Sequence, residues 1–148
     1  MYSEVTLADF ENMNDDYPCR LIVMLYDEAI ASLRAAIAAI EAGDIEARCK
    51  ATAQVTEVIS QLYLSLDMER GGEIADNLSR IYNLVITQMT QVNFANDATL
   101  AAQMMDLLMP LRDSWFDLDE RIRGSIEIAE GEDRATAAAG QTESGVAA

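Results

Sequence analysis

The feature that most constrains this chain is the spacing of its apolar residues. From Pro18 to about residue 42, large apolar side chains recur every three or four residues, the repeat of an α-helix that buries one face. The same spacing returns in three later segments, which begin near residues 44, 73 and 98. No segment shows the alternation of a strand. The spacing therefore predicts an all-α protein of four helices.

The breaks between these segments are short and contain residues that are typical of helix ends. Gly43 can adopt a positive φ at a helix end, and Asp44 can cap the next helix. Gly71-Gly72 ends the second segment, and residues 93–97 read as a loop with a capping acid. Short links favour antiparallel neighbours, so we expect an up-down four-helix bundle. At Pro110, inside the fourth segment, we expect a kink rather than a break, because the apolar stripe continues beyond it.

The ends of the chain differ in composition from its centre. Residues 1–16 carry five acids and no base, which predicts a mobile N-terminal arm. Residues 17–128 form the predicted bundle, which is long enough to bury a core without disulfides or metals. Residues 129–148 are rich in Ala, Gly, Glu and Thr and have little to bury, so a disordered tail is expected.

The charge of the chain excludes several classes of function. There are 26 acidic and 10 basic residues, no His, and a formal net charge of −16. Nucleic acids and anionic membranes are bound mainly through Lys and Arg, so neither is an expected partner. The absence of His excludes imidazole-based triads and His-containing zinc sites. No apolar run reaches the roughly 20 residues that span a bilayer. We therefore expect a cytoplasmic protein without membrane insertion.

Carboxylates remain as a potential source of chemistry. They fall mostly between the apolar positions, as Asp27 and Glu28 do, which indicates a solvated helix face. The Gly71-Gly72 pair lacks the preceding strand and nearby Lys of a phosphate loop. A metal-dependent enzyme would need inward-facing carboxylates on neighbouring helices. No nucleophile is paired with a base, so we expect no enzyme, no cofactor and no metal site.

Several apolar residues are left over after each helix has buried one face. They are Tyr63, Leu64, Leu84, Ile86, Met105, Met109 and Phe116. Such a surplus is typical of a surface that binds a partner helix. It is equally typical of central helices that are buried on more than one side, or of a bundle that forms a homodimer.

One stretch of the sequence resembles a known family. Residues 66–82 contain the pattern LDxExGGEIAxNLxxxY, and they closely resemble the signature of the flagellar secretion chaperone FliS family. Further matches occur in order at residues 18–29, Gly43-Asp44, Val92-Asn93 and 111–115. The chain departs from the family in having Tyr17 before Pro18, where the family usually has Ser, and in having Pro110.

The resemblance implies a cytoplasmic helical bundle that binds the disordered C-terminal segment of flagellin. It implies that this binding prevents premature polymerisation and assists delivery to the flagellar type III export gate, with co-chaperones as further partners. A bundle groove can receive the apolar face of such a segment. The expected state is a monomer or a weak homodimer. The alternative is a structural or regulatory bundle that acts through homodimerisation or through another flagellar partner.

The signature and the apolar surplus together select the candidate binding residues. The predicted flagellin-binding residues are Tyr26, Tyr63, Ile74, Leu78, Tyr82 and Leu84. In this family the N-terminal arm can cover the ligand groove, and here the covering residues would be Tyr2, Val5, Leu7 and Phe10.

Overall fold

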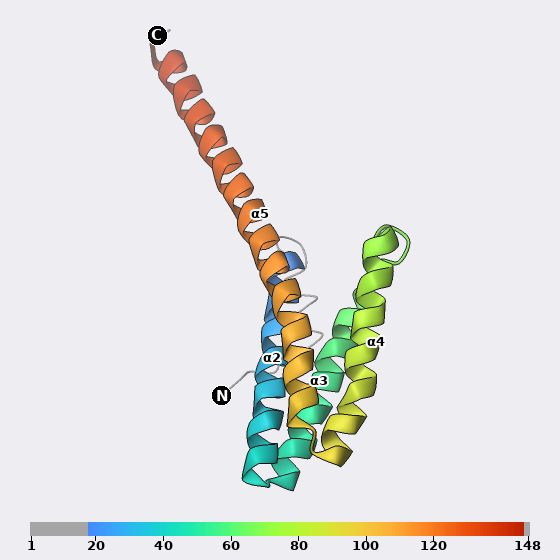
Figure 1. Cartoon of the computed structure of the whole chain (residues 1–148). Helices are drawn as coiled ribbons and strands as arrows, with labels where there is room; N and C mark the ends of the chain where they lie inside the picture. Colours follow the sequence, from blue (N-terminus) through green and yellow to red (C-terminus); the bar gives the residue numbers. More distant parts are fainter. Residues whose placement is uncertain (1–17, 147–148) are drawn as a thin grey trace.

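The computed structural model describes residues 18–146, and it is all α over that range. The helices, labelled as in Figure 1, are α2 (Pro18–Ala42), α3 (Ile45–Leu64), α4 (Gly72–Ala95) and α5 (Ala98–Val146). This confirms the all-α, four-helix expectation. The predicted arm of residues 1–16 lies outside the described residues.

Two of the three breaks between helices form at the residues expected, but α3 ends at Leu64, before the Gly71-Gly72 pair that was predicted to end it, because Ser65 caps it and residues 65–71 form a loop. Gly43 has a φ of +68°, and the Asp44 side chain accepts a hydrogen bond of 3.0 Å from the backbone N–H of Ala47. Before α5, Asp97 accepts one of 2.9 Å from the N–H of Leu100. The loop here is shorter than predicted, because α4 continues to Ala95 and ends at Asn96 in the left-handed conformation.

The core is formed by the apolar stripes of all four helices. Its most completely buried side chains include Leu25, Leu33, Val55, Ile59, Val85 and Leu108. These positions belong to the three- and four-residue spacing read from the sequence. Helical periodicity therefore identified the faces that pack together.

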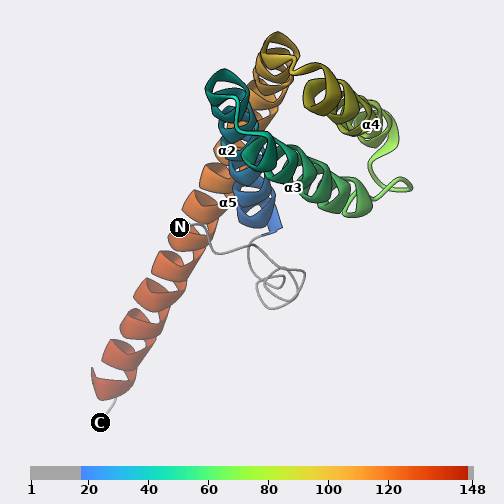
Figure 2. The same ribbon diagram turned by 90° about the horizontal axis from the view of Figure 1, so that it is seen from below.

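The bundle is open along one side. Helix α2 packs against both α3 and α5, and α3 packs against α4, but α4 has few contacts with α5. Figures 1 and 2 both show α4 and α5 diverging from the short loop that joins them. At the N-terminal end of α4, far from that loop, the apolar face of the helix is therefore not covered by α5.

Helix α5 is longer than the bundle. It continues through Pro110 without a break, as expected, and Figure 1 shows its C-terminal half projecting beyond the other helices. The sequence predicted a disordered tail from residue 129, whereas the structure has helix as far as Val146. The side chains of residues 127–139 are all exposed. Ala, Glu and Arg favour helix, and extending an existing helix avoids the cost of nucleation, which explains a helix that buries nothing.

Candidate functional site

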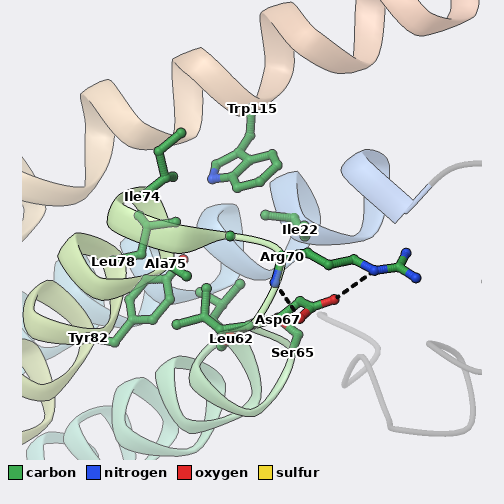
Figure 3. Close-up of a pocket in the computed structure, with 12 residues that line it drawn as sticks. Ile22, Leu62, Ser65, Asp67, Arg70, Ile74, Ala75, Leu78, Tyr82 and Trp115 are labelled. Atoms are coloured by element: carbon green, nitrogen blue, oxygen red, sulfur yellow. Dashed lines mark hydrogen bonds and ion pairs between the residues drawn. The ribbon is translucent and has the colours of Figure 1, made fainter.

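A pocket of about 270 Å³ lies at the open end of the bundle, where α4 and α5 are far apart. We call it the open-end pocket, and Figure 3 shows it in close-up. Its lining residues are Ile22, Leu62, Ser65, Leu66, Asp67, Arg70, Gly71, Ile74, Ala75, Leu78, Tyr82 and Trp115. All four helices contribute, and most of the side chains are apolar.

The α4 wall of the pocket is an apolar helix face that α5 covers only in part. Ile74, Leu78 and Tyr82 are four residues apart and therefore share one face of the helix. Leu78 is only 6% exposed and Tyr82 only 1%, but Ile74 is 70% exposed. The same apolar face is thus buried in the middle of α4 and open near its first turn.

The other walls come from the helices that remain packed. Trp115 projects from α5 into the pocket, and Ile22 reaches it from α2 (Figure 3). Leu62, which is 1% exposed, forms part of the floor from α3. Because these three side chains belong to the core or pack against it, the pocket walls are held in place by the fold.

The loop between α3 and α4 forms the rim. The Asp67 side chain accepts hydrogen bonds from the backbone N–H groups of Glu69 (3.2 Å) and Arg70 (3.0 Å), which holds the loop in a turn. The side chain of Arg70 is 92% exposed and points away from the apolar side chains in Figure 3. The rim is therefore polar and the interior apolar.

Two tyrosine hydroxyls meet beneath the pocket. Tyr26 on α2 and Tyr82 on α4 are joined by a hydrogen bond of 2.6 Å between their hydroxyl oxygens. Burial raises the pKa of both hydroxyls, although the hydrogen bond with Tyr82 and, to a smaller extent, the neighbouring Trp115 partly offset this effect on the pKa of Tyr26. This pair ties α4 to α2.

The structure brings together part of the predicted set of binding residues. Ile74, Leu78 and Tyr82 line the pocket, and Tyr26 lies behind Tyr82. Tyr63 and Leu84 are partly exposed, as the apolar surplus predicted, but neither lines the pocket. The arm residues Tyr2, Val5, Leu7 and Phe10 lie outside the described residues.

Sequence reasoning missed the contributions of three other helices to the pocket. Ile22, Leu62 and Trp115 were recognised only as members of core stripes. The spacing of apolar residues shows which face of a helix is buried, but it does not show where the neighbouring helix diverges. It therefore could not indicate that these three residues lie at the edge of the core. Trp115, in one of the segments that resemble the family, was the strongest available signal.

The described residues offer no cluster for metal chemistry. Within residues 18–146, no group of three or more Cys, Asp or Glu side chains is arranged to hold a metal ion. In the same part of the chain, no helix has the length and apolar character needed to cross a membrane.

Residues 9–121 match the family described as Flagellar protein FliS. The chain belongs to the FliS family. The flagellar secretion chaperone FliS of Salmonella typhimurium is 37% identical over 99 residues, which cover 66% of this chain and 73% of that protein. The flagellar secretion chaperone FliSB of Pseudomonas aeruginosa is 31% identical over 114 residues, covering 77% and 89%. FliS of Vibrio cholerae is 30% identical over 98 residues, covering 66% and 72%.

FliS membership assigns this chain to the flagellar secretion chaperones, which are not enzymes. The FliS signature of residues 66–82 coincides with the rim loop and with the α4 wall of the open-end pocket. The part of the sequence that most resembles the family therefore builds the pocket, and it does not lie on the closed side of the bundle.

Proposed function

We propose that this chain is a cytoplasmic export chaperone that binds the C-terminal segment of flagellin in a groove made up of the open-end pocket and the uncovered apolar face of α4 beside it. Binding keeps flagellin from polymerising before export and assists its delivery to the flagellar type III export apparatus. The proposal joins the family membership to one structural observation, the uncovered apolar face near the start of α4.

The uncovered face near the start of α4 is apolar, so a ligand that covers it must present apolar side chains. Ile74 continues the buried stripe of Leu78 and Tyr82, yet no side chain of the bundle covers most of its surface. Covering apolar surface is favourable by about 25 cal/mol per Å² removed from water. An amphipathic segment laid along the groove would bury Ile74 against its own apolar side chains, in the manner of a helix bound in a hydrophobic groove.

The proposed contacts extend beyond the pocket. Ile74, Leu78 and Tyr82 would contact the segment within it, with Tyr26 supporting Tyr82 from behind. Tyr63 on α3 and Leu84 on α4 are proposed contacts for parts of the segment that run past the pocket. A segment that becomes ordered on binding needs such an extended surface to offset its lost conformational entropy.

The arm is a separate proposal that rests on the family resemblance. Tyr2, Val5, Leu7 and Phe10 would cover the groove when no flagellin is bound. Deleting residues 1–14 should then strengthen the binding of a flagellin peptide. Unchanged or weaker binding would contradict the covering role.

Co-purification with flagellin tests the function. The full chain should retain full-length flagellin and lose flagellin that lacks its last roughly 40 residues, a length of about 60 Å as helix, which is enough to span several helices of the bundle. Equal retention of both forms would contradict the C-terminal site. Light scattering on the free chain tests the alternative, because a dimer that separates only on unfolding would favour action through homodimerisation.

A variant at Ile74 tests the groove. Ile74→Asp should weaken flagellin binding at least tenfold and leave the unfolding temperature nearly unchanged, because the side chain is already 70% exposed in the free protein. The matched control is Ile128→Asp, since Ile128 is 65% exposed on the projecting part of α5. Equal affinities for the two variants would remove the groove as the binding site.

A further inference from the structure

Helix α2 differs from the other three helices in the charges at its N-terminal end. Helices α3 and α5 follow the capping acids Asp44 and Asp97, and α4 carries Glu73 in its first turn. The first turn of α2 contains Arg20 and no acidic residue. The N-terminal end of a helix carries a partial positive charge, so an anion stabilises it and a cation destabilises it. Within its described residues, α2 therefore has no acid of its own at this end.

An acid on α5 lies level with this first turn. The ion pair of Asp27 and Arg112 joins α2 to α5, with 2.7 Å between the carboxylate and the Arg112 Nε, and the two helices run in opposite directions (Figure 1). Cys19 is eight residues before Asp27, which is about 12 Å along α2 at 1.5 Å per residue. Asp119 is seven residues after Arg112, which is about 10.5 Å along α5 in the same direction. Asp119 is therefore level with Cys19.

Asp119 is buried, in contrast to its acidic neighbours on α5. It is 5% exposed, whereas Asp117 and Glu120 are exposed. Its Oδ2 lies 3.5 Å from the Nε of Arg123, and its Oδ1 is buried without a hydrogen-bond partner. Cys19 on α2 is also buried, and burial raises the pKa of its thiol. The negative charge of Asp119 raises that pKa further, so this charge acts on the first turn of α2.

We propose that the Asp119 carboxylate is the negative charge for the N-terminal end of α2, supplied by α5. A buried carboxylate needs compensating positive charge, and the helix end provides this in addition to Arg123. Ile22, which lines the open-end pocket, is one turn beyond Cys19 on α2. Asp119 is thus a positioning residue, because it keeps the first turn of α2 helical and thereby keeps Ile22 in the pocket wall.

Hydrogen exchange on the full chain measures the first turn of α2. Asp119→Asn keeps the shape of the side chain and removes its charge. The backbone amides of residues 22–25, which donate to the carbonyls of the first turn, should then exchange about 2- to 5-fold faster, the size of a typical charge effect at a helix end. Asp117→Asn is the matched control, because Asp117 is exposed on the same helix, and it should change nothing. Unchanged exchange in Asp119→Asn would overturn the proposal.

A variant of Arg123 separates this role from an ion pair within α5. Arg123→Gln removes the neighbour of Asp119 on its own helix and keeps the carboxylate, so the amides of residues 22–25 should exchange as in wild type. If Asp119 served only its pair with Arg123, then Arg123→Gln and Asp119→Asn would have the same effect on α2, and that result would contradict the proposed role.

The Cys19 thiol reports the charge of Asp119 independently. The variant Cys49→Ser removes the other free cysteine of the described residues, and the alkylation rate at a series of pH values then gives the pKa of Cys19. Asp119→Asn in this background should lower that pKa, because a nearby negative charge disfavours the thiolate. An unchanged pKa would show that the charge does not reach the first turn of α2, and the proposal would fail.

A capping acid on the chain before α2 should compensate for the loss of Asp119. Tyr17 precedes Pro18, and Tyr17→Asp places there one of the side chains that cap helices best. Combined with Asp119→Asn, Tyr17→Asp should restore wild-type exchange, whereas Tyr17→Leu should not. Equal exchange in the two double variants would overturn the proposal. So would faster exchange in Asp15→Asn with Asp16→Asn but not in Asp119→Asn, because the charge would then come from the arm.

The consequence for the pocket rests on the proposed function. In calorimetric titration with a cognate flagellin C-terminal peptide, Asp119→Asn should weaken binding about 2- to 5-fold and Asp117→Asn should not change it. Faster exchange with unchanged affinity would overturn the positioning of Ile22. No binding of the peptide to wild type would instead defeat the proposed function, and the exchange and thiol measurements would still decide whether Asp119 holds the start of α2.

Discussion

Gly71 and Ala75 are packed so closely that the first turn of α4 has no room for a methyl group at residue 71. A Cβ placed on Gly71 would lie 2.5 Å from the Cβ of Ala75 and 2.7 Å from the carbonyl oxygen of Asp67. Both neighbours are held by the fold, because Ala75 is buried and the Asp67 carbonyl accepts a hydrogen bond of 2.8 Å from the N–H of Gly71. This contact joins the rim loop to the α4 wall of the open-end pocket.

Gly71→Ala should therefore destabilise the protein by about 1–3 kcal/mol, the usual cost of overpacking. Urea unfolding measures the change. Gly124→Ala is the control, because nothing lies within 4 Å of the corresponding Cβ position in α5. Alanine favours helix over glycine by up to about 1 kcal/mol, so the control should be neutral or more stable. A Gly71→Ala protein that unfolds at the wild-type midpoint would show that the turn can shift freely.

The ion pair between Asp27 on α2 and Arg112 on α5 should make only a small, salt-sensitive contribution. The Arg112 Nε lies 2.7 Å from the Asp27 carboxylate, but the two side chains are 28% and 51% exposed. Arg112→Gln should lower the free energy of unfolding by less than about 1 kcal/mol, and 1 M salt should reduce the difference. Arg70→Gln should cause no change, because the Arg70 side chain is 92% exposed and lies 3.8 Å from the Asp67 carboxylate. A loss that is the same at all salt concentrations would indicate packing against Phe116, which the Arg112 guanidinium covers at 4.8 Å.

Stability should fall in alkaline solution because of the buried tyrosine pair. Burial raises the pKa of Tyr26 and Tyr82 above the ordinary value of 10.0, so in the folded state both hydroxyls stay protonated at a pH where the unfolded chain ionises. Their contribution to stability is therefore complete below about pH 10 and is lost as the pH rises, by up to about 1.4 kcal/mol per pH unit for each tyrosine.

Urea unfolding at a series of pH values from 8 to 11.5 checks this sign and slope. The double variant Tyr26→Phe with Tyr82→Phe provides the reference, because it keeps every other titrating group. Its stability should decline less steeply than that of wild type. Equal slopes would mean that the two hydroxyls ionise as readily in the folded protein as in the unfolded chain.

The projecting end of α5 should contribute almost nothing to the stability of the bundle. Residues 129–139 are exposed throughout, so a chain ending at residue 128 should unfold at the wild-type temperature while losing helical circular dichroism signal. A chain ending at residue 114 is the contrast, because it lacks Trp115, which packs on the core, and the buried Asp119. That chain should unfold at a clearly lower temperature. A large loss on the first truncation would show that the projecting helix packs on another part of the protein.

Local sequence was sufficient to predict the bounds of α2 and the starts of the later helices, but not the end of α3 at Leu64. The predicted range of residues 18–42 agrees with α2, and Gly43 and Asp44 perform the expected roles at the next break. These features depend on backbone conformation and on side chains within one turn of the helix, so the nearby sequence contains the necessary information. The end of α5 was not predicted, because composition alone does not distinguish a helix that buries nothing from a disordered tail.

Some residues of the candidate site could be predicted from the sequence, and others could not. The signature identified the residues of the α4 wall, and the apolar surplus identified Tyr63 and Leu84 as incompletely buried. Periodicity could not show which surplus residues share a pocket, because it reports the face of one helix and not the distance to the next. Trp115 and Ile22 join Ile74 in the open-end pocket only because α5 stays packed on α2 while α4 leans away.

The sequence by itself determined the all-α class, the four helical segments, the face that each helix buries and, through its signature, the family. Only the tertiary structure decided that the bundle is open between α4 and α5, that Ile74 is uncovered, and that the hydroxyls of Tyr26 and Tyr82 meet below the pocket. The physical reason is that helix formation and capping are short-range, whereas the position of one helix relative to another depends on side-chain packing summed over the whole core.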